Sequence, residues 1–146
     1  MQLPIKLKTA IDENAFCAMA THLNTEEIQN HLMWIDYLDE NLIINTEKGR
    51  QKTYNIRTDS NISLVIFEPE AMYSSWEIRG EVEKVIDDDT ANHHIDKLSN
   101  RYTGHPYNRQ HNQSWEESQI KDREMWIIKT NKLISMVRPQ AKSDPE

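Results

Sequence analysis

The chain has 146 residues, of which 37% are hydrophobic, and it carries a formal net charge of −7. This length fits one domain, and the acidic balance argues against a general nucleic-acid-binding protein, which would present a basic face. The single cysteine, Cys17, excludes an internal disulfide, and we expect a cytoplasmic protein because the sequence has neither a signal peptide nor an apolar run long enough to span a membrane.

The first third of the chain predicts a short helix and three strands. Leu3, Leu7 and Ile11 recur at the helical spacing, which predicts a helix over residues 3–13. Residues 15–22 are small and apolar on both alternating faces, a pattern typical of a strand buried on both sides. Residues 28–35 and 42–46 predict two further strands, and residues 36–41 supply a turn between them.

The remainder predicts two helices and three more strands. A basic helix ends near Arg57, and residues 62–67 form a β-rich run. Residues 75–86 alternate cleanly, and Gly80 within them suggests a bulge or the close approach of another backbone. Asp87 can cap a helix that runs to about Tyr102. Residues 125–128 predict the last strand, which residues 133–137 can continue.

About six strands joined mostly by short links favour antiparallel pairing. We therefore predict a mainly β fold, a small six-stranded antiparallel barrel with peripheral helices. We expect one domain over residues 1–138 and a polar C-terminal tail over residues 139–146.

The most informative stretch, residues 42–57, is an apolar run followed by a cluster of cations. Lys48, Arg50, Lys52 and Arg57 surround Gly49, although the chain as a whole is acidic. Backbone N–H groups at a glycine-led helix start, together with Arg and Lys, can bind a phosphate. The alternative is a solvated first helical turn, because basic turns are common.

The other titratable residues favour structural interpretations. His93 and His94 are adjacent on a helix and face different ways, so we predict no metal site. His105 and His111 lie in a long polar loop, where they could supply a proton or simply be loop residues. Cys17 fits a small core residue.

Several segments, in a fixed order, resemble one known family. They are Phe-Cys-Ala-Met-Ala-Thr at 16–21, Trp-Ile-Asp-Tyr at 34–37, the basic turn at 45–55, Glu-Ile-Arg-Gly-Glu at 77–81 and Arg-Tyr-Thr-Gly-His-Pro-Tyr at 101–107. Together they resemble the split β-barrel flavin-binding proteins of the pyridoxamine 5'-phosphate oxidase-like superfamily. The last segment is similar to a loop of the branch of probable enzymes dependent on the deazaflavin coenzyme F420.

The resemblance implies a homodimer with two cofactor sites at the subunit interface. It also implies a set of cofactor-binding residues: Arg50 and Lys52 at the phosphate, Thr46 and Asn55 beside it, Lys48 at the mouth, Met33 and Trp34 along the ring, and Arg79 with Trp76 near the interface. From the residues alone, a core position is favoured for Met33 and Trp34, and Lys48 could equally be a solvated lysine.

The resemblance implies an oxidoreductase in which reduced coenzyme F420 delivers hydride to a small electron-poor molecule, such as an enone, a quinone or a nitro compound. The cofactor would supply the hydride chemistry, so the catalytic side chains remain unassigned. One alternative is an FMN-dependent flavin reductase or oxidase, and another is a non-catalytic flavin- or haem-binding protein. Vitamin B6 oxidation is not expected, because the Arg-containing C-terminal segment of true pyridoxamine phosphate oxidases is not recognisable.

Overall fold

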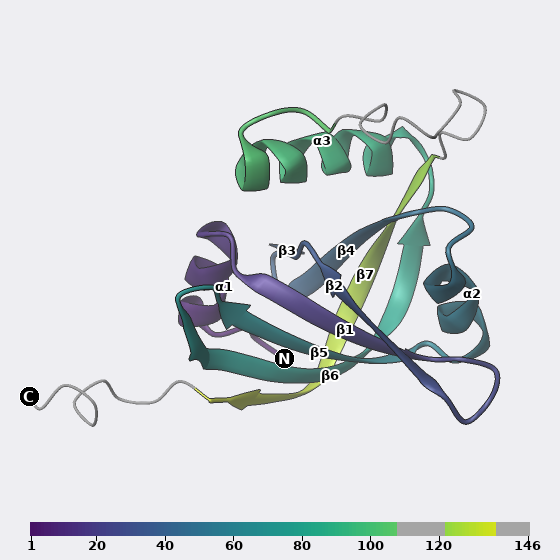
Figure 1. The fold of residues 1–146 in the computed structure, drawn as a ribbon, viewed down its shortest axis with the longest axis horizontal. Coiled ribbons are helices and arrows are strands. Elements are labelled where there is room, and N and C mark those ends of the chain that lie inside the picture. The colour runs from purple at the N-terminus through teal and green to yellow at the C-terminus, as the bar shows by residue number, and fades with distance from the viewer. Residues whose placement is uncertain (108–121, 137–146) are drawn as a thin grey trace, which may run out of the picture.

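The structure is a computed structural model that describes residues 1–107 and 122–136. Over these residues the chain forms three helices and seven strands (Figure 1). The helices are α1 (Ile5–Asp12), α2 (Gln51–Thr58) and α3 (Asp89–Thr103). The strands are β1 (Phe16–His22), β2 (Ile28–Met33), β3 (Asp36–Leu38), β4 (Asn41–Glu47), β5 (Asn61–Glu68), β6 (Ala71–Ile86) and β7 (Arg123–Ser135). His111 and the expected tail at 139–146 lie outside the described residues.

All seven strands belong to one antiparallel sheet with the order β2-β1-β5-β6-β7-β4-β3. This confirms the mainly β, antiparallel prediction, with two differences. The sheet has seven strands rather than six, and within residues 1–107 and 122–136 the strand pairing does not close into a barrel. The additional strand, β3, is only three residues long and lies where turn residues predominate, so it is too short to show a periodicity.

The long strands β6 and β7 hold the sheet together. β6 pairs with β5 on one side and with β7 on the other. β7 runs without a break through residues 129–132, so residues 133–135 continue the strand predicted at 125–128. The pairing register shifts between Arg79 and Gly80. A Cβ atom at Gly80 would lie 2.3 Å from the carbonyl oxygen of Lys129. The expected bulge and close backbone approach at Gly80 are therefore both present.

Replacing Gly80 by alanine should destabilise the fold by about 1–3 kcal/mol, because the atom in contact belongs to the β7 backbone and cannot move without disturbing the pairing. The free energy of unfolding from urea denaturation measures this change. Glu81→Ala is the control, since it shortens the next side chain of the same strand. A Gly80→Ala protein as stable as the wild type would contradict this prediction.

Strand β1 is buried on one face only, whereas its composition predicted burial on both. Cys17, Met19 and Thr21 point into the core, while Phe16 is 44% exposed. Val65 on the neighbouring strand β5 is also exposed on this outer face, opposite Ala18. The apolar residues on the outer face of β1 and β5 are therefore exposed to solvent in a single copy of the chain.

Helix α3 lies above the end of the sheet that contains β3 and β4 (Figure 1). It begins one residue later than expected, because the side chain of Asp88 accepts the hydrogen bond from the Thr90 backbone N–H. Its buried stripe is Ala91, Ile95 and Leu98, as the helical period predicted. No helix among the described residues is long and apolar enough to cross a membrane.

Candidate functional site

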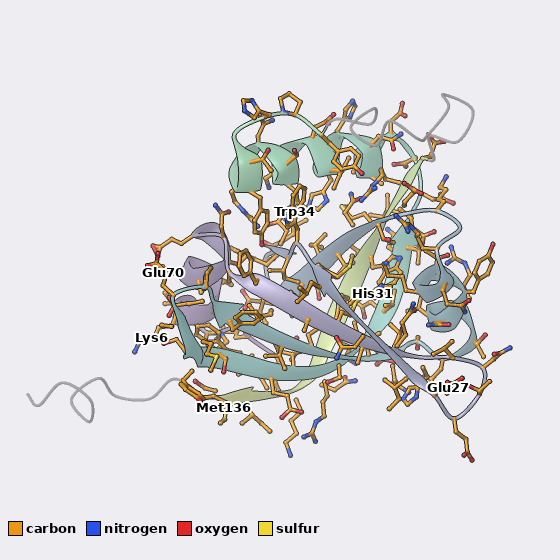
Figure 2. All side chains as sticks on the ribbon, viewed as in Figure 1. Lys6, Glu27, His31, Trp34, Glu70 and Met136 are labelled. Atoms are coloured by element: carbon orange, nitrogen blue, oxygen red, sulfur yellow. The ribbon has the colours of Figure 1, made fainter. Side chains whose placement is uncertain are left out.

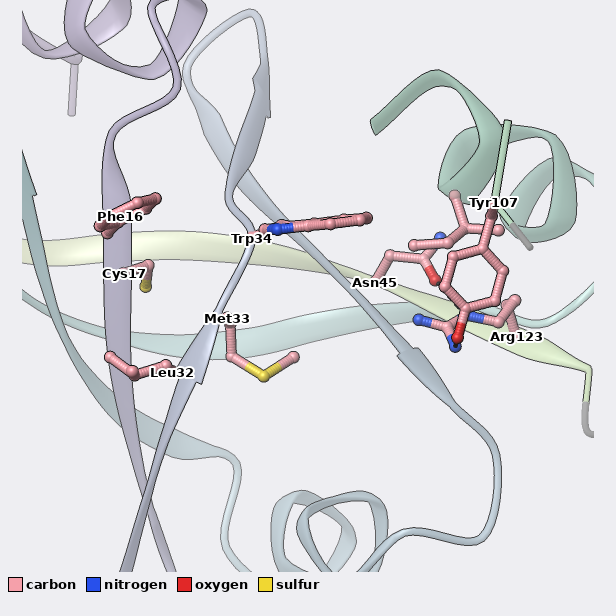
Figure 3. Close-up of a pocket in the computed structure, with 9 residues that line it drawn as sticks. Phe16, Cys17, Leu32, Met33, Trp34, Asn45, Tyr107 and Arg123 are labelled. Carbon is pink, nitrogen blue, oxygen red and sulfur yellow. Dashed lines mark hydrogen bonds between the residues drawn. The ribbon is translucent and has the colours of Figure 1, made fainter. Parts of the chain in front are cut away.

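The largest of the described pockets lies between α3 and strands β1, β2, β4 and β7 and has a volume of about 400 Å³ (Figure 3). One side is mainly apolar and the other carries the polar groups. The lining residues are Phe16, Cys17, Leu32, Met33, Trp34, Asn45, Ile95, Tyr107 and Arg123. A mainly apolar pocket with a few convergent polar groups is typical of a small-molecule or cofactor site.

Trp34, which lines this pocket, is part of an aromatic stack. The rings of Trp34 and Tyr102 lie parallel, with their planes 6° apart and their centroids 5.1 Å apart. Figure 2 shows Trp34 between the sheet and α3. The Tyr102 hydroxyl donates to the carbonyl oxygen of Ala15 and accepts from the Ile35 backbone N–H, at 2.6 and 3.2 Å. These bonds hold the stack rigidly against β1 and β2.

A second group of polar residues lies at the start of α2. Lys52 is only 7% exposed, and its ammonium donates to Nδ1 of His31 on β2, at 3.2 Å. Among the described residues, no carboxylate oxygen lies within 4.0 Å of this ammonium. Arg50 immediately precedes the helix and pairs loosely with Glu47, at 3.7 Å. Lys52 and Arg50 therefore concentrate positive charge at the partly buried start of α2.

The electrostatics of this group favour an anion. Burial lowers the pKa of Lys52, and the charges of Arg50 and Arg123 lower it further, against a smaller opposing effect of Glu47. Burial and the charges of Lys52 and Arg50 likewise lower the pKa of His31. These cations repel one another, and a bound anion would relieve the repulsion.

The backbone at the start of α2 is arranged to suit the same kind of ligand. Gly49 has φ +83°, a left-handed conformation that other residues rarely adopt, and it turns the chain from β4 into the helix. No side chain caps the helix at Arg50, and its first turn contains no acidic residue. The helix N-terminus thus leaves donor groups and a positive dipole end for an anion such as phosphate.

The other residues expected near the phosphate have different surroundings from Arg50 and Lys52. Thr46 is buried in β4. Asn55 is also buried, and its side-chain nitrogen donates to Thr21 and Gln29, so it fastens α2 to the sheet. Lys48 donates to the carbonyl oxygen of Asp87 and lines a smaller pocket of about 250 Å³, not the largest one.

Of the remaining residues expected at the cofactor, two line the pocket and two lie elsewhere. Met33 and Trp34, which were expected to lie along a cofactor ring, both line the largest pocket. Arg79 is paired with Glu77 and lines a different pocket of about 330 Å³. Trp76 is buried in the core, at 2% exposure, and not at a surface.

An ionic cluster around Asp36 fixes α3 to the sheet. The carboxylate of Asp36, which is 4% exposed, accepts from His94 at 2.9 Å and from Arg101 at 3.1 Å, and the Lys97 ammonium lies 3.6 Å away. Burial alone would raise the pKa of Asp36. The hydrogen bonds from His94 and the Tyr37 backbone, together with the charges of Lys97 and Arg101, instead lower it to about 2.

Sequence reasoning did not include Asn45, Tyr107, Arg123 or His31 among the site residues. Tyr107 ends the segment at 101–107 whose resemblance was noticed, so that segment already pointed to it. Arg123 had only a weak signal, as a cation just before an apolar strand. Its partners come from distant parts of the chain, which one sequence does not reveal.

Within the described residues, no group of three His, Cys, Asp or Glu side chains is placed to hold a metal ion. His93 is exposed, while His94 faces Asp36, so the two side chains diverge as adjacent helical positions predict. Burial raises the pKa of Cys17, so its thiol is a core group rather than a nucleophile.

The antiparallel sheet, the pocket lined by Trp34 and the basic start of α2 define a small, mainly β protein with a ligand-sized pocket. Residues 3–136 match the family described as Pyridoxamine 5'-phosphate oxidase. The chain therefore belongs to this family, whose members bind flavin-type cofactors and include oxidoreductases.

Solved structures agree with this fold. One described as an F420 reductase is 22% identical, with a TM-score of 0.72, and the match covers 90% of this chain and 98% of that one. A candidate pyridoxamine 5'-phosphate oxidase from Listeria innocua is 12% identical, with a TM-score of 0.62 and coverages of 89% and 94%. A candidate 5-nitroimidazole antibiotic resistance protein from Bacteroides thetaiotaomicron is 13% identical, with a TM-score of 0.63 and coverages of 91% and 82%. Identities of this size establish the fold alone. No curated protein matches the sequence.

Proposed function

We propose that this protein is an oxidoreductase that binds coenzyme F420 and promotes hydride transfer to a small electron-poor acceptor. The observation that carries the proposal is the buried ammonium of Lys52, which has an imidazole as its partner and lies beside an uncapped helix N-terminus. A phosphate is the ligand that this arrangement fits best. The likeness to an F420 reductase supports the deazaflavin rather than another phosphate-bearing ring.

The residues of this chain would then bind and orient, and the cofactor would supply the hydride chemistry. Arg50, Lys52 and the first turn of α2 would hold the phosphate. Met33 and Trp34 would line the ring, and the Tyr102 stack would keep Trp34 in place. The apolar lining would limit the access of water to the reacting face. Thr46 and Asn55 would support this group from the sheet rather than contact the phosphate.

The likeness to a candidate 5-nitroimidazole resistance protein supports a nitro compound as one acceptor class, alongside enones and quinones. Binding of FMN and of coenzyme F420 to the apo protein, compared by fluorescence titration, tests the proposal. Tight F420 binding with weak FMN binding is the expected result. Preference for FMN would move the protein to the flavin reductases and oxidases. Tight binding of either cofactor without turnover of any acceptor would favour a non-catalytic carrier.

We also propose that the working form is a homodimer with the pocket at its interface. The outer face of β1, β2 and β5 exposes Phe16, Leu32 and Val65, at 44%, 77% and 40%. Phe16 and Leu32 also line the pocket, so a second copy on this face would close it. An exposed apolar face that continues into a ligand pocket is suited to a symmetric interface.

Replacing Val65 by glutamate should therefore shift the protein from dimer to monomer and weaken cofactor binding together, because a charge would be buried at the interface. Light scattering should give about twice 17.3 kDa for the wild type. Val65→Thr keeps the β-branched shape and is the matched control. A monomeric wild type that still binds the cofactor tightly would remove the interface from the proposal.

A further inference from the structure

The polar side of the pocket contains a buried cation, Arg123. Arg123 begins β7, is 8% exposed and lines the pocket. The carbon at the centre of its guanidinium lies 4.9 Å from the centroid of the Tyr107 ring. Figure 3 shows these two residues with Asn45 on one side of the pocket, and Phe16 and Leu32 on the opposite side. A guanidinium keeps its charge at every accessible pH, so this side of the pocket is permanently positive.

A chain of hydrogen bonds fixes the position of Arg123. Its Nε donates to Oδ1 of Asn45 at 2.9 Å, and Nδ2 of Asn45 faces Nδ1 of His94 at 3.1 Å. Nδ2 of Asn45 also donates to the carbonyl oxygen of Ala91 at 2.8 Å. Nε2 of His94 lies 2.9 Å from the Asp36 carboxylate.

The direction of this chain follows from its two ends. Because Oδ1 of Asn45 accepts from Arg123, its Nδ2 must donate to His94. Nδ1 of His94 is then an acceptor, and its Nε2 carries the proton that is donated to Asp36. All three bonds run from the guanidinium toward the carboxylate, so each strengthens the next. Arg123 is therefore held in one orientation, which suits recognition better than a mobile surface charge would.

Arg123 is also close enough to Lys52 for its charge to lower the pKa of that ammonium. Lys52, however, does not line the pocket, and Arg123 does. A ligand that fits both groups has a phosphate for Lys52 and an electron-rich edge for Arg123. Carbonyl oxygens and an acidic ring N–H along one side of a planar heterocycle provide such an edge.

We infer that Arg123, positioned by Asn45, His94 and Asp36, binds the carbonyl-bearing edge of the ring and stabilises the form of that edge that has lost a proton. This inference rests on the proposed function, because it needs a ring in the pocket. It adds a second recognition point, one that selects planar rings with an acidic imide edge over apolar rings of the same size.

Phosphate-free analogues separate the two recognition points. The probes are FMN and riboflavin or, for a protein that prefers F420, that cofactor and its deazariboflavin chromophore. Arg123→Met should weaken the binding of both members of a pair by the same factor, on the order of 10- to 100-fold. Lys52→Met should weaken only the phosphate-bearing member. Lys129→Met, an exposed cation on the same strand, is the matched control.

A spectroscopic reading adds a test that a merely structural role would not pass. The pH at which the bound ring loses its imide proton, followed by absorbance, should be higher in Arg123→Met than in the wild type. Arg123→Lys keeps the charge but loses the Nε bond to Asn45, and it should give an intermediate affinity. Thermal denaturation shows which variants fold. If Arg123→Met does not fold, Arg123→Lys carries the test.

The outcomes distinguish the possibilities. If Arg123→Met weakens only the phosphate-bearing probe, Arg123 is a phosphate ligand and the inference is wrong. Wild-type affinity for riboflavin in Arg123→Met or Arg123→Lys would also overturn it, while leaving the proposed function intact. A wild-type protein that binds none of the four probes removes the proposed function, and the inference with it.

Discussion

Lys52→Met should weaken binding of FMN or F420 by about 10- to 100-fold, because one charge-assisted hydrogen bond to a phosphate contributes about 1.5–3 kcal/mol. Combined with Arg50→Met, the loss should reach several kcal/mol. The same Lys52 substitution should leave the apo protein as stable as before or more stable. The lysine is buried among cations that lower its pKa, and methionine has a similar shape without the charge.

Fluorescence titration measures the affinity, and thermal denaturation of the apo protein measures the stability. The opposite signs of these two effects are the informative result, because residues kept for ligand binding often reduce stability. Lys6→Met, an exposed lysine on α1, controls for the loss of one positive charge. If Lys52→Met destabilises the apo protein and binds the cofactor normally, the lysine is structural and the phosphate assignment fails.

Asp36→Ala should destabilise the protein by about 3–5 kcal/mol, since removing one member of a buried ionic cluster leaves the others without compensation. Asp36 accepts from His94 and Arg101, and it is the point at which α3 is fastened to β3. The free energy of unfolding from urea denaturation at neutral pH measures the loss. Glu83→Gln, which removes an exposed carboxylate from β6, is the control.

Acid should reproduce part of this effect in the wild type. The pKa of Asp36 falls from 3.8 to about 2 on folding, so its contribution is complete above pH 4–5 and is lost as the pH falls through 2. A shift of this size corresponds to about 2 kcal/mol. The Asp36→Ala protein should lose less stability than the wild type between pH 5 and 2. Equal losses in the two proteins would show that Asp36 is not the group responsible.

Much of the fold was predictable because most elements carry their own local signal. The alternation of Trp76, Ile78 and Val82 identified β6, and the helical spacing of Ala91, Ile95 and Leu98 identified α3. The strand β3 and the continuous β7 were not predictable in this way. β3 is too short for a period, and β7 is held through residues 129–132 by its pairing with β6.

The candidate site was also predictable only in part. The basic stretch at 45–57 was visible as four cations around a glycine, and the order of the motifs pointed to the family. Which of the cations would be buried was not visible. Lys48 and Lys52 look alike in the sequence, but the helix turns Lys52 toward His31, while Lys48 faces Asp87.

By itself the sequence determined the mainly β class, most of the strands and helices, and a basic turn suited to phosphate. Periodicity and turn residues are local, so one chain is enough to show them. The tertiary structure alone decided that Asp36, His94, Asn45 and Arg123 form one chain of hydrogen bonds into the pocket. In the sequence, Asn45 lies 49 positions from His94 and 78 positions from Arg123. Only the packing of α3 against β4 and β7 brings these residues together.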